Sequence, residues 1–124
     1  MNTTARRAAA PLALMALIFF LSAQSDPGAD IGGVGRVVAH AGEYALLCLL
    51  WAWALLPSLR WPAPVVAAAA ISLAYALSDE FHQSFVPGRE ASAFDLVVDT
   101  AGIGLAVALA LSRLSPRAGR SRTG

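Results

Sequence analysis

The stretch VVAHAGEYALLCLLWAWALL, residues 37–56, decides the fold class of this chain. It is almost entirely apolar, and its length matches the roughly 20 residues that a helix needs to cross the hydrocarbon core of a bilayer. Its one basic and one acidic side chain, His40 and Glu43, both lie near its start. The stretch therefore predicts a transmembrane helix with one polar end.

The composition of the whole chain agrees with a membrane protein. Of its 124 residues, 57% are hydrophobic and 14% are charged, whereas soluble domains have roughly 45–50% apolar and 25% charged residues. A net charge of +1 gives no bias towards nucleic acid, and a single cysteine, Cys48, excludes an intrachain disulfide. The length suits one domain, residues 1–124.

Three further apolar segments lie along the chain, one before residues 37–56 and two after them, separated by stretches rich in Gly, Pro and Asp. We predict transmembrane helices at about residues 8–23, 37–56, 64–81 and 93–111, and a basic tail at 113–124. The third and fourth segments reach spanning length only if their acidic residues lie at one membrane interface. The expected fold is an all-α, four-helix transmembrane bundle.

The arginines set the expected orientation. Most of the nine basic residues, all arginine, lie at one set of helix ends: Arg6, Arg7, Arg60, Arg113, Arg117, Arg120 and Arg122. The positive-inside rule places these ends, and hence both termini, in the cytoplasm. A multi-pass protein of the inner (cytoplasmic) membrane is predicted. A competing interpretation makes the first segment a cleaved secretory signal, because Arg6-Arg7 precedes an apolar run ending in Leu-Ser-Ala.

With this topology, polar groups from three distant segments lie at one depth, at the extracytoplasmic face. His40 and Glu43 share a helical face, and so do Asp95 and Asp99. The predicted polar cluster, a candidate binding or acid/base site, consists of His40, Glu43, Asp79, Glu80, His82, Gln83, Arg89, Asp95 and Asp99.

Asp99 is the member of this cluster that most needs a partner. It lies about 6 Å deeper than Asp95 along the helix, and an unpaired carboxylate at that depth costs a few kcal/mol. His40, His82 and Arg89 are the obvious partners, with Arg36 as a further candidate. Asp95 has a simpler explanation, because Ser92 followed by Asp95 fits a helix-capping box.

Small residues continue the stripe of Asp95 and Asp99 along the last helix. Gly102 and Ala106 follow at helical spacing, and such a stripe marks a face turned towards neighbouring helices rather than lipid. We expect Gly102 to let another backbone come close.

Four interpretations of the cluster are open. The polar network could serve only to hold the helices together. It could bind an anionic or amide-rich ligand through Arg89 and the carboxylates. It could act as an enzyme with His40 or His82 as acid/base, or hold a divalent metal between these histidines, Glu43 and Asp79. The sequence carries no nucleophile elbow, phosphate loop or zinc signature, so no catalytic residue, metal or cofactor is assigned.

The same residues carry a resemblance to a known family. HAGEYALLCLL from His40, LSDEFHQSFVPGREASAFDLVVDTAGIG from Leu77 and the FFLSAQS end of the first segment resemble the VanZ-like family. That family's pattern is H-x-x-E-Y, then D-E-x-H-Q-x-F-x-P-G-R, then D-x-x-x-D and a Gly in the next helix.

The resemblance implies a small integral membrane protein that retains its first helix. The family is named for a member associated with low-level resistance to teicoplanin, a glycopeptide that binds cell-wall precursors outside the membrane. The leading hypothesis is therefore an envelope protein that binds or processes a cell-wall or lipid component. Its expected partners are the bilayer and a lipid, a cell-wall precursor or a glycopeptide, with no nucleic acid. The alternative is a membrane scaffold without catalysis, so whether the chain is an enzyme stays open.

Overall fold

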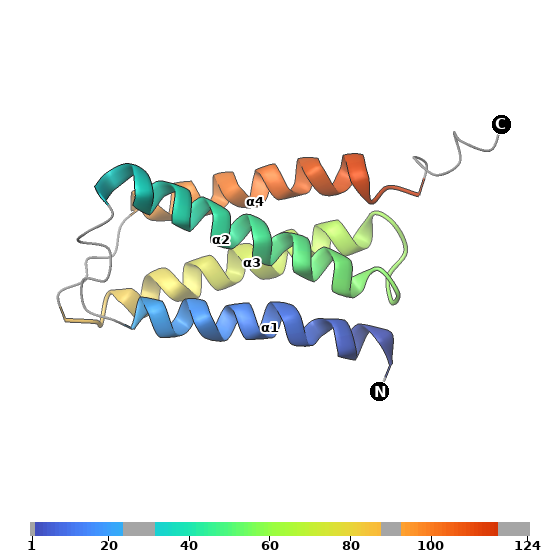
Figure 1. Ribbon diagram of the computed structural model, residues 1–124, viewed down its shortest axis with the longest axis horizontal. Helices are drawn as coiled ribbons and strands as arrows, with labels where there is room; N and C mark the ends of the chain where they lie inside the picture. Colours follow the sequence, from blue (N-terminus) through green and yellow to red (C-terminus); the bar gives the residue numbers. More distant parts are fainter. Residues whose placement is uncertain (1, 24–31, 88–92, 117–124) are drawn as a thin grey trace.

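The computed structural model describes residues 2–23, 32–87 and 93–116. Within these ranges the chain forms four helices and no strand (Figure 1). The helices are α1 (Thr3–Ser22), α2 (Gly32–Leu55), α3 (Ala63–Gln83) and α4 (Ala93–Arg113). All four are long and apolar enough to cross a membrane, which confirms the predicted all-α, four-helix transmembrane fold.

Local signals explain where the helices begin. The Asn2 side chain accepts a hydrogen bond of 2.7 Å from the backbone N–H of Ala5, so it caps α1 and lets the helix start before the predicted residue 8. Pro64 lies in the first turn of α3, where a missing backbone N–H is harmless.

Helix α2 begins five residues before the predicted position, because residues 32–36 belong to the helix rather than to the connector. The glycines in this segment disfavour a helix by about 1 kcal/mol each relative to alanine. A tertiary contact compensates, since the first turns of α2 carry Arg36 to a carboxylate of α4.

The start of α1 and the end of α4 lie at the same end of the bundle (Figure 1). We call this the arginine end. The opposite end, where α1 and α3 finish and α2 and α4 begin, is called the polar end. The described arginines at the arginine end are Arg6, Arg7, Arg60 and Arg113. The described acidic residues all belong to the polar half: Glu43, Asp79, Glu80, Asp95 and Asp99.

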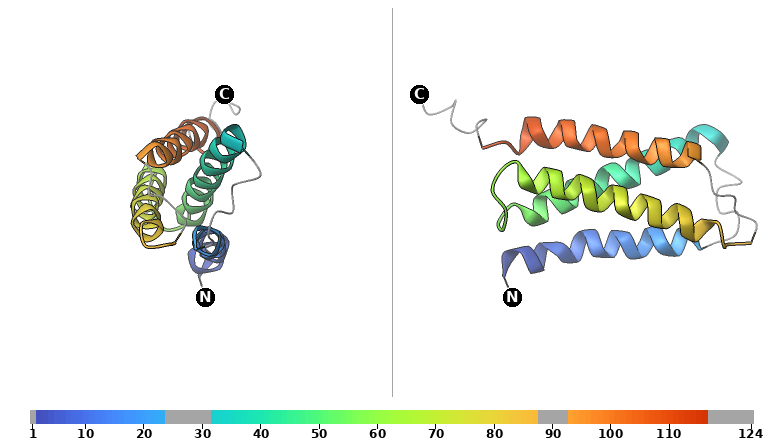
Figure 2. Two further views of the ribbon diagram at one scale, coloured as in Figure 1. Left: turned by 90° about the vertical axis from the view of Figure 1, so that its left-hand side faces the viewer. Right: turned by 180° about the vertical axis from the view of Figure 1, so that it is seen from behind.

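Helices α2 and α3 cross in the middle of the bundle, with α1 and α4 on opposite sides of the pair (Figures 1 and 2). The crossing exchanges their neighbours from one end to the other. At the arginine end α2 contacts α1, where the Arg7 guanidinium donates to the Trp53 carbonyl at 2.9 Å and lies 4.6 Å from the centre of its ring. At the polar end α2 contacts α4 instead, and α3 contacts α1.

Small side chains dominate the core. The buried alanines include Ala52, Ala68, Ala76, Ala106 and Ala110, with Tyr44, Leu47 and Cys48 among the larger buried side chains. Such residues let helix backbones approach closely, which is how helices associate inside a bilayer.

The closest backbone approach lies between α2 and α4. A Cβ atom placed on Gly102 would lie only 2.3 Å from the backbone oxygen of Ala41. The prediction that Gly102 admits a neighbouring backbone is confirmed, and no larger residue fits there without moving a helix.

Large apolar side chains cover the outside of the bundle. Phe20, Val66 and Leu105 are among the many that are exposed. In water such a surface would promote aggregation, whereas a bilayer solvates it. The outer face therefore agrees with four helices surrounded by lipid.

Candidate functional site

An ion pair and a His–Asp contact join α2 to α4 at the polar end; we call these four residues the α2–α4 seam. Arg36 Nη2 lies 2.6 Å from Asp95 Oδ2, and His40 Nδ1 lies 3.0 Å from Asp99 Oδ1. The helices run in the same direction, and the partners are four residues apart on both of them, so successive turns stay in register. Asp95 and Asp99 are buried, and their pairing offsets the penalty of placing carboxylates inside the bundle.

A second set of contacts joins α1 to α3 at the same end, and we call it the α1–α3 seam. The His82 ring stacks on Phe19, with ring centres 4.5 Å apart and planes inclined by 25°. The amide of Gln83 donates to Ser22 Oγ across 3.4 Å, which is long for a hydrogen bond. This seam contains no ion pair among the described residues.

A buried tyrosine connects the two seams. Tyr44 of α2 donates its hydroxyl to Asp79 Oδ2 of α3 at 3.3 Å, and both residues are buried. Asp99 is close enough to Asp79 and to Asp95 for electrostatic interaction. The carboxylates of α3 and α4 therefore belong to one electrostatic neighbourhood around the start of α2.

The last turn of α3 holds three buried polar atoms that have no hydrogen-bond partner among the described residues: Asp79 Oδ1, His82 Nδ1 and Gln83 Oε1. Asp79 is 6% exposed and Gln83 is 1% exposed. Buried polar atoms are normally bonded, and each one left without a partner costs about 1–3 kcal/mol. Two further such atoms, Ser72 Oγ and Trp51 Nε1, lie apart from this group.

The structure brings most of the predicted cluster to one end of the bundle. His40, Asp95 and Asp99 form the α2–α4 seam, while His82 and Gln83 belong to the α1–α3 seam, with Asp79 between them. Glu43 and Glu80 are half-buried at the same end, and Glu43 is in electrostatic range of His40. Arg89 lies outside the described residues, as does Ser92 of the predicted capping box.

One of the two histidines predicted as partners for Asp99 is confirmed, and the other is not. His40 is its partner, as one of the expected pairings had it. His82 is not, because its ring lies against α1 rather than α4. The crossing of α2 and α3 explains the difference, since it turns the polar end of α3 towards α1.

The two histidines that the metal hypothesis combines lie in different seams. His40 contacts Asp99 and His82 contacts Phe19. In the ranges that the structure describes, no group of three or more His, Cys, Asp or Glu side chains is arranged to hold a metal ion.

Sequence reasoning missed the contribution of α1. Ser22 and Phe19 supply partners to α3, and the Tyr75 hydroxyl donates to the Met15 carbonyl at 2.5 Å. A serine in the apolar run FFLS was the available signal, because a buried hydroxyl in a membrane helix usually bonds to a neighbouring helix.

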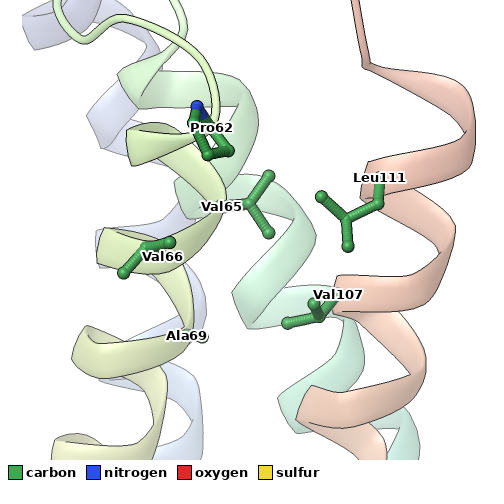
Figure 3. Close-up of a pocket in the computed structure, with 6 residues that line it drawn as sticks. All are labelled: Pro62, Val65, Val66, Ala69, Val107 and Leu111. Carbon is green, nitrogen blue, oxygen red and sulfur yellow. The ribbon is translucent and has the colours of Figure 1, made fainter.

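A hollow of about 420 Å³ lies away from this polar cluster, between α3 and α4 at the arginine end (Figure 3). Its lining is wholly apolar: Pro62, Val65, Val66, Ala69, Val107 and Leu111. Val66 and Leu111 are also exposed on the outside of the bundle. The side chains that line the hollow offer no hydrogen-bonding or ionisable group.

Comparison with known proteins gives one result. The family described as VanZ/LLP1 matches residues 8–114. No curated protein and no solved structure matches the chain significantly. The matched range contains all the described residues of both seams and nearly the full length of the four apolar helices. The chain therefore belongs to the VanZ/LLP1 family and is a multi-pass membrane protein.

Proposed function

We propose that this protein lies in the cytoplasmic membrane and binds or processes a lipid or cell-wall component of the envelope at its polar end. The arginine end faces the cytoplasm in this proposal, because arginine-rich ends remain on the inner side. The polar end then faces outwards, where cell-wall precursors are exposed.

The unpartnered polar atoms in the last turn of α3 carry the proposal. A network that served only to join helices would be expected to satisfy its buried atoms, because each one left without a partner reduces stability. Asp79 and Gln83 instead retain hydrogen-bonding capacity beside a seam that is only loosely bonded. That capacity is what a ligand site requires.

We also propose a link to glycopeptide susceptibility, of the kind for which the VanZ-like family is named. Teicoplanin acts on cell-wall precursors outside the membrane. An outward-facing site for an envelope component would act in the same compartment, so altered susceptibility is a suitable readout.

The α2–α4 seam favours a second candidate function, a scaffold whose polar network only stabilises helix packing. Arg36 and His40 each have a carboxylate partner, and Gly102 brings the backbones together. These features account for the position of four members of the polar end without any ligand.

Complementation of a deletion strain separates the two candidates. The strain is tested for susceptibility to envelope antibiotics, teicoplanin included, and for its lipid profile, with the amount of protein in the membrane measured in parallel. We expect wild-type protein and Ser78→Ala, an exposed polar change in the same turn of α3, to restore the phenotype. Asp79→Asn should insert normally and fail to restore it. Full restoration by Asp79→Asn would support the scaffold. So would the disappearance of the Asp79→Asn protein from the membrane.

Reporter fusions test the orientation. We expect a reporter that works only in the cytoplasm to be active at either terminus. A reporter that works only outside the cytoplasm should be active when it is inserted after Pro87. The reverse pattern would place the polar end in the cytoplasm and contradict the proposal.

A further inference from the structure

Resting on the proposed function, we infer that the polar end recognises a lipid through hydrogen-bond donors of its head group, N–H or O–H, and that Asp79 is the residue that accepts from them. A head group rich in acceptors, such as a bare phosphate, is therefore disfavoured.

Asp79 decides this chemistry because an ionised carboxylate can only accept hydrogen bonds. Oδ2 accepts from the Tyr44 hydroxyl, while Oδ1 is buried and has no partner among the described residues. A donor placed at Oδ1 gains a charge-assisted bond, which is roughly twice as strong as a neutral one. A phosphate oxygen at the same place would bring two acceptors and two negative charges together.

The neighbouring groups favour the same kind of ligand. Gln83 follows Asp79 by one helical turn, and its free amide atom is the acceptor Oε1. His82 Nδ1 can also accept when the imidazole is neutral. Three atoms within five residues thus offer acceptors to one region.

The bases that α2 brings to the polar end are already engaged. Arg36 contacts Asp95, and His40 contacts Asp99. Within the described ranges, Asp79 has no basic side chain in contact with it. Among the described residues, an added anion would therefore find no counter-charge in contact with Asp79.

Helix direction adds to this electrostatic preference. Helices α1 and α3 both end at the polar end. The carboxyl end of a helix carries a partial negative charge of roughly half an elementary charge. Two such ends border the α1–α3 seam, so a donor group, and above all an ammonium, is favoured there over an anion.

The last turn of α3 ends a helix of spanning length, and this position puts it near the depth of lipid head groups. Phe81 on the outside of α3 and Phe85 just after the helix are 69% and 71% exposed, with ring centres 5.1 Å apart in an edge-to-face arrangement. These exposed rings carry no polar group, so they suit contact with lipid acyl chains. Asp79 and Gln83 belong to the same turns, on the inner side, which is the level at which a head group would reach them.

Binding of matched lipids to the purified full-length protein tests the inference. Phosphatidylethanolamine and phosphatidylcholine with identical acyl chains have the same net charge, but only the first has N–H donors. We expect wild-type protein to bind phosphatidylethanolamine at least about tenfold more tightly, measured by native mass spectrometry or by lipid titration in detergent. A glucosyl diacylglycerol, with hydroxyl donors and no charge, shows whether an ammonium or a sugar is the better donor. Phosphatidate supplies the acceptor-rich comparison.

Variants connect the preference to Asp79. Asp79→Asn should reduce the preference for donor-bearing head groups to less than about threefold, whereas Ser78→Ala should keep it. Three results would each overturn the inference. They are equal binding of phosphatidylethanolamine and phosphatidylcholine by the wild-type protein, a preference of that protein for phosphatidate, and an undiminished preference for donor-bearing head groups in Asp79→Asn. The wild-type comparison does not depend on how well any variant folds.

The outcome is separable from that of the proposed function. If complementation requires Asp79 but the head groups bind equally, the donor rule fails and the envelope function stands. If the lipids show the expected order while deletion and complementation have no envelope phenotype, the lipid site stands and the envelope function fails.

Discussion

The two seams at the polar end solve the same packing problem with different contacts. Each joins two helices that run in the same direction. The α2–α4 seam uses a direct backbone approach at Gly102, a short ion pair and a short His–Asp contact. The α1–α3 seam uses a ring stack and one long hydrogen bond, and it borders three unpartnered polar atoms.

The difference separates structural support from capacity for binding. Ionisable groups inside a bundle are stabilising only when they are paired, and the α2–α4 seam meets that condition. The last turn of α3 does not, so its atoms reduce stability unless another molecule bonds to them. Retained groups of this kind are typical of functional sites, where stability is exchanged for activity.

The largest expected effect concerns Gly102. Gly102→Ala should lower the free energy of unfolding by about 2 kcal/mol or more, because the new Cβ would overlap the Ala41 carbonyl. Gly104→Ala is the matched control, since no atom outside the helix lies within 4 Å of the added Cβ. Unfolding of the purified protein by a denaturing detergent measures both. Equal stability of the two variants would show that α2 and α4 are not in backbone contact.

A comparison of double-mutant cycles has the next largest effect. The cycle of His40→Ala with Asp99→Asn should give a coupling energy of about 1 kcal/mol, in the upper part of the range for polar pairs between membrane helices. The cycle of Ser22→Ala with Gln83→Leu should give less than about 0.5 kcal/mol, because its hydrogen bond is long. A larger coupling for the second pair would reverse the contrast between the seams.

The ring stack is expected to contribute less. Phe19→Leu keeps most of the apolar volume and removes the stack on His82, so it should destabilise the protein by about 0.5–1 kcal/mol. Phe94→Leu serves as the control, because Phe94 is exposed on the lipid-facing side of α4. If both changes have the same small effect, the stack does not hold α1 against α3.

The smallest expected change in stability belongs to Asp79→Asn. It keeps the shape of the side chain and removes a charge that has only the Tyr44 hydroxyl as a described partner. The free energy of unfolding should not fall, because the change removes a buried charge that has no counter-charge among its described partners, while Asp99→Asn, which removes the partner of His40, should lower it. A loss of stability in Asp79→Asn that exceeds the loss in Asp99→Asn would assign Asp79 to the structural network.

The sequence predicted the fold and the gathering of the polar groups at one end of the bundle because both follow from local patterns. Apolar length gave the four helices, and the stripe from Asp95 to Ala106 gave the buried face of α4. The start of α2 was wrong by five residues, because glycines normally weaken a helix and the tertiary contact of Arg36 was not visible in the sequence.

Pairings were less predictable, because they depend on how the helices cross. His40 and His82 looked equivalent as partners for Asp99, but the crossing of α2 and α3 gives only His40 access to α4. The roles of Ser22 and Tyr44 depend on the same crossing. Helical spacing shows which residues share a face, whereas the identity of the opposing helix is a property of the whole bundle.

The crossing of α2 and α3 also has a mechanical consequence. A stiff rod that tilts about a middle contact moves its two tips in opposite directions. Anything that displaces the Gln83 tip of α3 would therefore shift the Pro62 tip as well, and with it the apolar hollow between α3 and α4. Binding of a ligand at one side of the membrane would then be coupled, through a tilt of α3, to the packing of lipid chains in the hollow at the other side.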